Sequence, residues 1–197
     1  MIIALEWWIC VWKTSIWKML AEKFWWIYIQ EHTPYIKDTK KLKLTFKNFD
    51  EYLVTFLEFL KVEENRLKNI DVKNNLIILD RSIYSLLAFA YSKWKKDNID
   101  YSQVLDYVNF ENIHISDLLI IIHIDSKERI NRLNKDIIRK NKTPKIFYDY
   151  DFNIGLYEYL NNIYHNKKYL IEVKNENIEH TFNKIFEIIN KEICIKN

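Results

Sequence analysis

Short apolar segments alternate with amphipathic ones along the whole chain, and this alternation is the feature that most limits its fold. Apolar runs predict strands at residues 1–5, 27–29, 76–79, 118–124 and 169–173. Apolar residues at helical spacing predict helices at residues 14–24, 49–68, 82–93, 101–110, 127–140, 152–165 and 178–191. Strands that alternate with helices form a parallel sheet covered on both faces. We therefore expect a single three-layer α/β domain over residues 1–197.

The carboxyl ends of the strands are where a sheet of this kind binds its ligands. Four of the predicted strands lead into loops of interest, and these strands end at Leu5, Ile29, Leu79 and Ile124. We expect the functional residues in the loops that follow them.

Charge and composition exclude several classes of partner. The formal charge of +3 comes from 30 basic and 27 acidic residues that are interspersed, whereas a dedicated nucleic-acid binder usually has a concentrated basic face. No apolar run is long enough to span a bilayer, and residues 1–5 lack the basic region of a signal peptide. Cys10 and Cys194 lie far apart without metal-ligand spacing, which favours a reducing compartment. We expect a cytoplasmic protein that binds neither nucleic acid nor membrane.

The loop after the first predicted strand matches part of a phosphate-binding motif. That motif reads G-x-x-x-x-G-K-[ST] between a strand and a helix, and Lys13-Thr14 matches its last pair. In such a loop, backbone N–H groups surround the phosphates of ATP, the lysine reaches the outer phosphates and the hydroxyl group holds Mg²⁺. We predict that ATP is bound by the residues of this loop: Trp7, Trp8, Ile9, Cys10, Val11, Trp12, Lys13, Thr14 and Ser15.

The two glycines of the motif fall on tryptophan, at Trp7 and Trp12. An indole at either position fills the space that the phosphates need. The chain has one glycine and seven tryptophans, although a chain of this length usually has about 14 glycines. Because the codon UGA is read as tryptophan in some genetic codes and as glycine in others, we hypothesise that some or all of these tryptophans are glycines in the working protein. The alternative is that they are real and form an aromatic core or a stacking surface.

The other tryptophans suggest the same hypothesis. Trp25-Trp26 stands where the helix at 14–24 is expected to end, a place that favours glycine. Trp17 lies on that helix, where close packing against a sheet often selects a small residue. Trp94 falls in a predicted polar loop, where a large aromatic side chain has nothing to pack against.

The loop after the third predicted strand carries the most specific motif, Asp80-Arg81-Ser82-Ile83-Tyr84-Ser85-Leu86-Leu87-Ala88-Phe89. With glycines restored, residues 1 to about 160 resemble the thymidylate kinase and deoxynucleoside kinase group, which implies the P-loop NTPase fold. Thymidylate kinases carry D-R-Y-x-x-S-x-x-A-[YF] here, and deoxynucleoside kinases carry E-R-S-x-x-S. The chain mixes the two patterns, because Asp80 follows the first and Ser82 the second. Ile9 also replaces the acidic residue of the thymidylate kinase phosphate loop.

Asp80 and Arg81 suggest a chemistry that does not depend on the resemblance. A carboxylate at the end of a buried strand can orient Mg²⁺ or its water, so we predict that Thr14 and Asp80 serve the metal. The arginine offers a fork of donors to an acceptor phosphate or to the transferred phosphoryl group. The alternative is that Asp80 caps the next helix and that Arg81 pairs with it on the surface.

The resemblance implies an acceptor-binding loop after the second strand, with Glu31, Pro34 and Tyr35. Glu31 would be the base that takes the proton of a nucleoside 5′-hydroxyl group, a role that a nucleotide acceptor does not need. The alternative for Glu31 and His32 is an ordinary solvated loop, and we assign His32 no role. The remaining predicted acceptor-binding residues are Phe56, Arg66, Arg81 and Ser85. A place in the packed core also suits Phe56.

The resemblance further implies a lid at about residues 132–151, whose arginines close over the phosphates. Arg132 and Arg139 are the candidates, and together with Lys13 and Arg81 they make up the predicted catalytic set. The alternative is that the lid arginines belong to a solvated helix face.

The first function hypothesis is a kinase that uses ATP and Mg²⁺ to convert dTMP to dTDP. The second is a deoxynucleoside kinase with Glu31 as its base. A third is a non-catalytic protein of the same fold, if the tryptophans are real. A nucleic-acid module that stacks bases on aromatic side chains gains little support, because the tryptophans fall in predicted turns. The resemblance also implies a homodimer.

Overall fold

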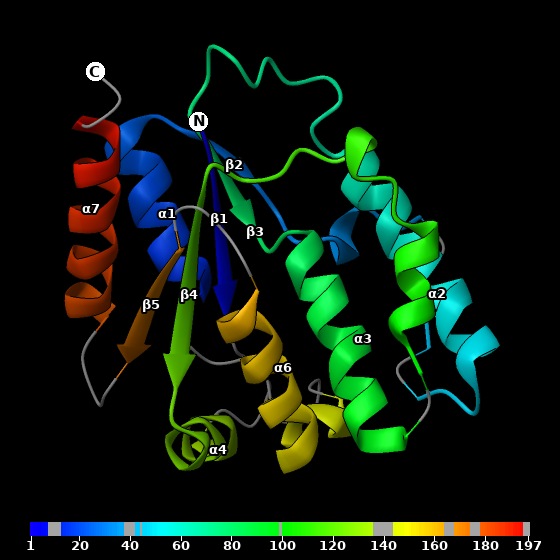
Figure 1. Cartoon of the computed structure of the whole chain (residues 1–197). Helices are drawn as coiled ribbons and strands as arrows, with labels where there is room; N and C mark the ends of the chain where they lie inside the picture. Colours follow the sequence, from blue (N-terminus) through cyan, green and yellow to red (C-terminus); the bar gives the residue numbers. More distant parts are fainter. Residues whose placement is uncertain are drawn as a thin grey trace.

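The computed structural model describes residues 1–7, 13–37, 42–43, 45–98, 100–135, 144–163, 168–173 and 178–194. Within these ranges, five parallel strands form one sheet in the order β2-β3-β1-β4-β5 (Figure 1). The strands are β1 (Ile2–Trp7), β2 (Ile27–Ile29), β3 (Ile77–Asp80), β4 (Leu118–Ile124) and β5 (Lys168–Val173). The parallel sheet confirms the predicted fold class.

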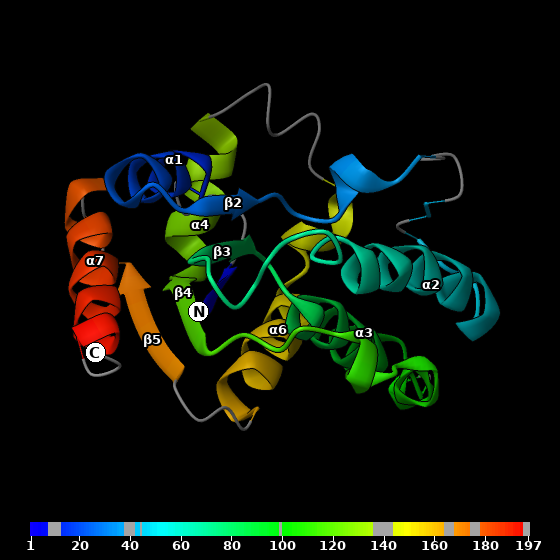
Figure 2. The same cartoon turned by 90° about the horizontal axis from the view of Figure 1, so that it is seen from above.

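Helices cover both faces of this sheet, which gives the molecule three layers (Figures 1 and 2). α1 and α7 pack together on one face, α3 and α6 pack together on the other, and α2 packs against α3. α4 lies beyond the carboxyl end of β4 (Figure 1). The helices are α1 (Lys13–Phe24), α2 (Phe49–Asn65), α3 (Ile83–Asp97), α4 (Ser126–Lys135), α6 (Tyr150–Asn162) and α7 (Ile178–Cys194). Short 3₁₀ helices are η1 (Thr33–Tyr35), η3 (Ser102–Tyr107), η4 (Phe110–Asn112) and η5 (Lys145–Tyr148).

Successive residues of each strand belong to opposite layers. Ile3 and Leu5 of β1 pack in the core formed with α1 and α7, whereas Ile2 and Ala4 pack in the core formed with α3 and α6. A parallel sheet that is buried on both faces needs apolar residues at every position. This is why most residues of β1, β3 and β4 are apolar, a pattern that predicts buried strands from the sequence.

The helix starts are fixed by polar side chains that satisfy free backbone N–H groups. The Asn48 side chain accepts a hydrogen bond from the backbone of Glu51 at 3.0 Å and so begins α2. Ser82 caps α3 through the backbone N–H of Tyr84 at 3.3 Å. Because Ser82 and not Asp80 caps α3, the alternative role of Asp80 as the helix cap is wrong.

Most predicted elements are confirmed, and two predictions are wrong. The helix predicted at 101–110 is replaced by the short 3₁₀ helix η3 and the start of η4. The polar loop predicted around Trp94 is the last turn of α3, where the ring of Trp94 lies edge-on to Tyr91 at 5.6 Å. Among the described residues, no helix has both the length and the apolarity that a membrane span requires.

The remaining tryptophans outside the phosphate loop fall into two groups. Trp25 directly follows α1 with a left-handed backbone (φ 57°), and its side chain is 95% exposed. Left-handed backbone after a helix is the conformation that glycine adopts most easily. Trp17, by contrast, is fully buried, and Trp26 stacks on Phe24 at 4.1 Å. Trp25 therefore agrees with the glycine hypothesis, while Trp17 and Trp26 behave as core residues, as the alternative expects.

Candidate active site

Polar residues gather at the carboxyl ends of β1, β2 and β3, which are neighbours in the sheet. Asp80 ends β3, is paired in register with Leu5 of β1, and is only 2% exposed. The hydroxyl group of Tyr28, from β2, donates to Asp80 Oδ2 at 3.0 Å. The contact with Tyr28 fixes the Asp80 carboxylate at the carboxyl end of β3, the strand between β1 and β2.

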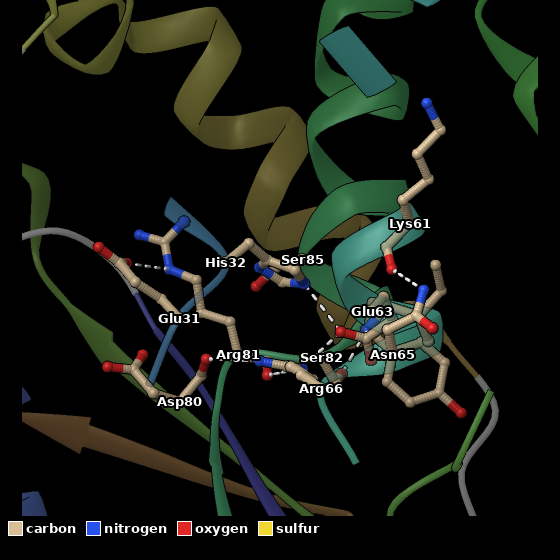
Figure 3. A network of polar contacts seen from close by, with 12 residues as sticks. Glu31, His32, Lys61, Glu63, Asn65, Arg66, Asp80, Arg81, Ser82 and Ser85 are labelled. Atoms are coloured by element: carbon tan, nitrogen blue, oxygen red, sulfur yellow. Dashed lines mark hydrogen bonds and ion pairs between the residues drawn. The ribbon is translucent and has the colours of Figure 1, made fainter. Parts of the chain in front are cut away.

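Arg81 follows Asp80 and faces the predicted acceptor loop (Figure 3). Its Nε lies 3.5 Å from Oε2 of Glu31, and both side chains are partly exposed. Its backbone has φ 66°, a left-handed conformation that is unfavourable for a residue with a Cβ atom. Arg81 therefore pairs with Glu31 rather than with Asp80 on the surface, and this backbone conformation directs it there.

Glu6, which the sequence predictions did not include, is a fully buried carboxylate near the end of β1. Its Oε1 accepts hydrogen bonds from the backbone N–H of Ser82 at 2.8 Å and from the Ser82 hydroxyl group at 2.5 Å. The Ser85 hydroxyl group donates to Oε2. Burial raises the pKa of Glu6 to about 7, against these hydrogen bonds, which favour the charged form. Ser85, predicted to bind the acceptor, is thus engaged by Glu6.

A second buried group joins α2 to the same loops (Figure 3). His32 Nε2 lies 2.8 Å from Glu63 Oε2, and Arg66 Nη2 lies 2.6 Å from the same oxygen. Burial lowers the pKa of His32, although its hydrogen bond to Glu63 opposes this. Burial would raise the pKa of Glu63, but the charge of Arg66 and the hydrogen bond with His32 hold it below its usual value. The solvated-loop alternative is therefore wrong for His32, which is 3% exposed.

Several predicted site residues stay predictions because they lie outside the described part of the chain. These are Trp8, Ile9, Cys10, Val11, Trp12 and Arg139. Trp7 ends β1 and Lys13-Thr14 begins α1, so the backbone runs from strand into helix as the phosphate-binding motif requires, but the side chains of these three residues are not described. Ser15, one residue further along α1, is exposed.

The other predicted residues are spread around this cluster. Pro34 and Tyr35 form η1, directly after the acceptor loop, and Tyr35 is 44% exposed. Phe56 is buried among the aromatic residues of the core between α2 and α3, as the alternative expects. Arg132 pairs with Glu128 of α4 at 2.8 Å. The role of each in catalysis or binding remains a prediction.

Asp80 is the carboxylate that the sequence predicts for a metal ion at this position. Among the described residues, no group of three histidine, cysteine or acidic side chains could hold a metal ion by itself. Mg²⁺ usually binds one or two carboxylates and takes its other ligands from phosphates and water. Asp80, together with the Thr14 hydroxyl group at the start of α1, remains the predicted metal site.

Glu6 and Glu63 were not predicted as site residues, although the sequence pattern around each of them marks it as unusual. Glu6 interrupts the apolar run of β1, where a charge is costly unless it is hydrogen-bonded. Glu63 lies in the apolar stripe of α2, at helical spacing from Leu60 and Leu67, which are both buried. A charged residue at a core position of a strand or helix is therefore informative even without a motif.

The sheet order and the two helical layers are those of the P-loop NTPase fold, which solved nucleoside and nucleotide kinases share. Deoxyadenosine kinase from M. mycoides has a TM-score of 0.72 at 18% identity, over 97% of this chain and 100% of that one. Thymidylate kinase from Candida albicans has a TM-score of 0.66 at 17% identity, over 97% and 91%. Thymidylate kinase from Ehrlichia chaffeensis has a TM-score of 0.63 at 18% identity, over 96% and 98%. No protein-family model and no curated protein sequence matches the chain.

Proposed function

We propose that the chain is a kinase that transfers a phosphoryl group from ATP to the 5′-hydroxyl group of a deoxynucleoside. The observation that carries this proposal is the Glu31–Arg81 pair at the mouth of the polar cluster, with Nε and Oε2 3.5 Å apart. A carboxylate beside a guanidinium group provides a base for the hydroxyl proton and a positive charge for the incoming phosphoryl group. The phosphate of a nucleotide acceptor would instead be repelled by the negative charge of Glu31.

The structural neighbours support this reading at the level of the fold. The deoxyadenosine kinase from M. mycoides has been seen with dATP, with dCTP, and with dCMP and a flexible dCDP. This chain spans its full length. We infer that ATP lies at the start of α1 and that the deoxynucleoside lies beside η1 and Glu31, on the other side of Arg81.

Each predicted site residue has one role in the proposed reaction. Lys13 and the N–H groups of residues 7–15 hold the phosphates of ATP, and Glu31 takes the proton from the acceptor hydroxyl group. Arg81, with Arg132 and Arg139 from the lid at 132–151, neutralises charge on the moving phosphoryl group. Thr14 and Asp80 would hold Mg²⁺, which when bound would supply positive charge to offset the charge of the phosphates.

A second candidate is the conversion of dTMP to dTDP. It is favoured by Asp80, which follows the thymidylate kinase pattern, and by the thymidylate kinases among the structural neighbours. In that case Arg81 would leave Glu31 and bind the phosphate of dTMP. A homodimer and a cytoplasmic location, both inferred from the sequence, remain predictions.

Either activity requires space for phosphates in the loop after β1, and therefore glycine at positions 7 and 12. The experiment compares the chain as written with a chain that has glycine at positions 7 and 12, which leaves the buried rings of Trp17 and Trp26 in place. ATP and Mg²⁺ are supplied with deoxyadenosine, deoxycytidine, thymidine or dTMP. We expect the glycine form alone to bind ATP and to phosphorylate a deoxynucleoside. Activity on dTMP alone would establish the second candidate, and no phosphorylation by either form would overturn both.

The gene itself tests the glycine hypothesis. If the seven codons are UGA and mass spectrometry of the native protein finds glycine there, the proposed activity belongs to the natural chain. Seven UGG codons would contradict the hypothesis and would favour the non-catalytic alternative.

A further inference from the structure

His32, Glu63 and Arg66 form a buried chain of contacts that no part of the proposed chemistry uses. The His32 and Glu63 side chains are 3% and 2% exposed, and the Arg66 side chain is 1% exposed. Taking charges out of water is costly unless each has partners, and here the carboxylate of Glu63 lies between an imidazole and a guanidinium group. Figure 3 shows Glu63 and Arg66 beside the segment that carries Arg81 and Ser82, on the side away from Glu31.

Arg66 connects the group to the backbone on either side of the site. Its Nη2 donates to the carbonyl oxygen of Arg81 at 2.5 Å, and its Nη1 lies 3.4 Å from that of Asp80. The same Nη1 donates to the carbonyl oxygen of Gln30 at 3.3 Å. One guanidinium group thus joins the loop after β2 to the loop after β3.

Glu63 fixes the other side of Arg81. Its Oε1 accepts a hydrogen bond from the backbone N–H of Ile83 at 3.0 Å, while its Oε2 contacts His32 and Arg66. The backbone of Arg81 is therefore held by α2 through its own carbonyl group and through a residue two positions later. A left-handed residue with a Cβ atom persists only where its surroundings hold it in place.

We propose that His32, Glu63 and Arg66 are positioning residues that keep Arg81 left-handed and keep Glu31 opposite it. His32 is the neighbour of Glu31, so its contact with Glu63 fixes the acceptor loop, while Arg66 fixes the loop of Arg81. The base and the guanidinium group then face each other before the acceptor binds. This inference rests on the proposed function for its kinetic consequence, although the conformation of Arg81 can be observed without any activity.

Glu63→Gln is the central variant, and Glu192→Gln is its matched control. A glutamine at 63 can still accept from Ile83, but its amide nitrogen would replace the oxygen that Arg66 contacts, so an N–H donor would face the donors of the guanidinium group. Glu192 is also a buried helical carboxylate, and it accepts from the hydroxyl group of Tyr169 at 2.6 Å. Tyr169 lies near the start of β5, at the opposite edge of the sheet from the site.

A second pair of variants tests the histidine. His32→Gln retains an amide N–H that can donate to Glu63, whereas His32→Leu has a similar volume and no donor. We expect the glutamine to keep most of the activity and the leucine to lose it. This pair also keeps the proposal testable if Glu63→Gln does not fold.

The experiment uses the full chain with glycine at positions 7 and 12, and it measures steady-state kinetics and the crystal structure of each variant. We expect Glu63→Gln and His32→Leu to lower kcat/KM for the deoxynucleoside about 100-fold, with the KM for ATP nearly unchanged. The crystal structures should show that Arg81 has left the left-handed region. Glu192→Gln should change neither. Equal kinetic effects of Glu63→Gln and Glu192→Gln, or a left-handed Arg81 in the Glu63→Gln and His32→Leu structures, would overturn the proposal.

The two proposals fail in different ways. If the parent chain phosphorylates no deoxynucleoside, the proposed function is wrong. The φ angle of Arg81 in the variant structures still decides whether His32, Glu63 and Arg66 position it.

Discussion

The carboxylate of Glu6, near the end of β1, receives both the backbone N–H and the hydroxyl group of Ser82, at 2.8 and 2.5 Å. Ser82 begins α3, and Glu6 immediately precedes the loop that is predicted to hold ATP. A change in the charge of Glu6 therefore acts on two elements. One is β1, which precedes the predicted ATP loop, and the other is α3, which follows the loop of Asp80 and Arg81.

Replacing Glu6 by glutamine should change how stability depends on pH. Burial raises the pKa of Glu6 to about 7 in the folded chain, from 4.5. The folded state then binds the proton more tightly than the unfolded state, so this stabilisation is present below pH 4.5 and is lost as the pH rises through about 7. The loss corresponds to about 3 kcal/mol. Glutamine keeps a carbonyl oxygen for Ser82 and offers an N–H group to Ser85.

Urea denaturation of the wild-type chain and of Glu6→Gln, at several pH values from 4.5 to 8, measures this effect. The difference between the two free energies of unfolding isolates Glu6, since the other titrating groups are common to both chains. Parallel pH profiles would show that Glu6 does not titrate in this range.

Replacing Glu31 by glutamine should separate the two candidate activities. Glutamine has the same shape but cannot take a proton, and loss of a general base typically lowers the rate about 10²–10⁴-fold. We expect such a fall in kcat for a deoxynucleoside, measured in the glycine form of the chain. Phosphorylation of dTMP needs no base, so any activity on dTMP should be retained. An unchanged rate with the deoxynucleoside would exclude Glu31 as the base.

Trp25 and Trp26 are adjacent, yet glycine should have opposite effects at the two positions. Trp25→Gly should stabilise the chain by about 1 kcal/mol, because Trp25 is left-handed and its 95% exposed side chain packs on little. Trp26→Gly should cost about 3 kcal/mol or more, because the ring of Trp26 is buried and stacks on Phe24. Thermal and urea denaturation of the two variants measures both changes. Equal destabilisation would contradict the structure around Trp25.

Gly155 should not tolerate even alanine. A Cβ atom at this position of α6 would lie 2.8 Å from the Cα atom of Ser92 in α3, and a backbone atom of a packed helix cannot move aside easily. Overpacking of this kind usually costs about 1–3 kcal/mol, more than the gain of up to about 1 kcal/mol that alanine brings to a helix. A Gly155→Ala variant that is as stable as the parent chain would show that α3 and α6 can separate.

The layers of the fold were predictable because each depends on a local pattern. Strands buried on both faces need apolar residues throughout, as in β4, and the helices of the outer layers repeat their apolar residues every three or four positions. The apolar residues of segment 101–110 have the spacing of a helix, so the sequence predicts one there. The structure instead has the short 3₁₀ helix η3 and the start of η4.

The candidate site was only partly predictable. The Asp80-Arg81 loop has a motif, but the contact between Arg81 and Glu31 depends on a left-handed backbone that arginine does not favour by itself. The carbonyl group of Arg81 contacts the side chain of Arg66, which follows α2 and lies 15 residues earlier in the chain. Contacts between residues far apart in the chain leave no local pattern in the sequence. The sequence around His32 therefore gives no indication of its contact with Glu63.

The order β2-β3-β1 has a consequence for the reach of a single side chain. Neighbouring strands lie about 4.8 Å apart, so the predicted ATP loop after β1 and the acceptor loop after β2 begin only about 10 Å from each other. Arg81 follows the strand between them. An extended arginine is long enough to turn from one loop to the other without any movement of the sheet. In the proposed reaction, this one arginine would therefore contact the phosphoryl group both on the donor side and on the acceptor side.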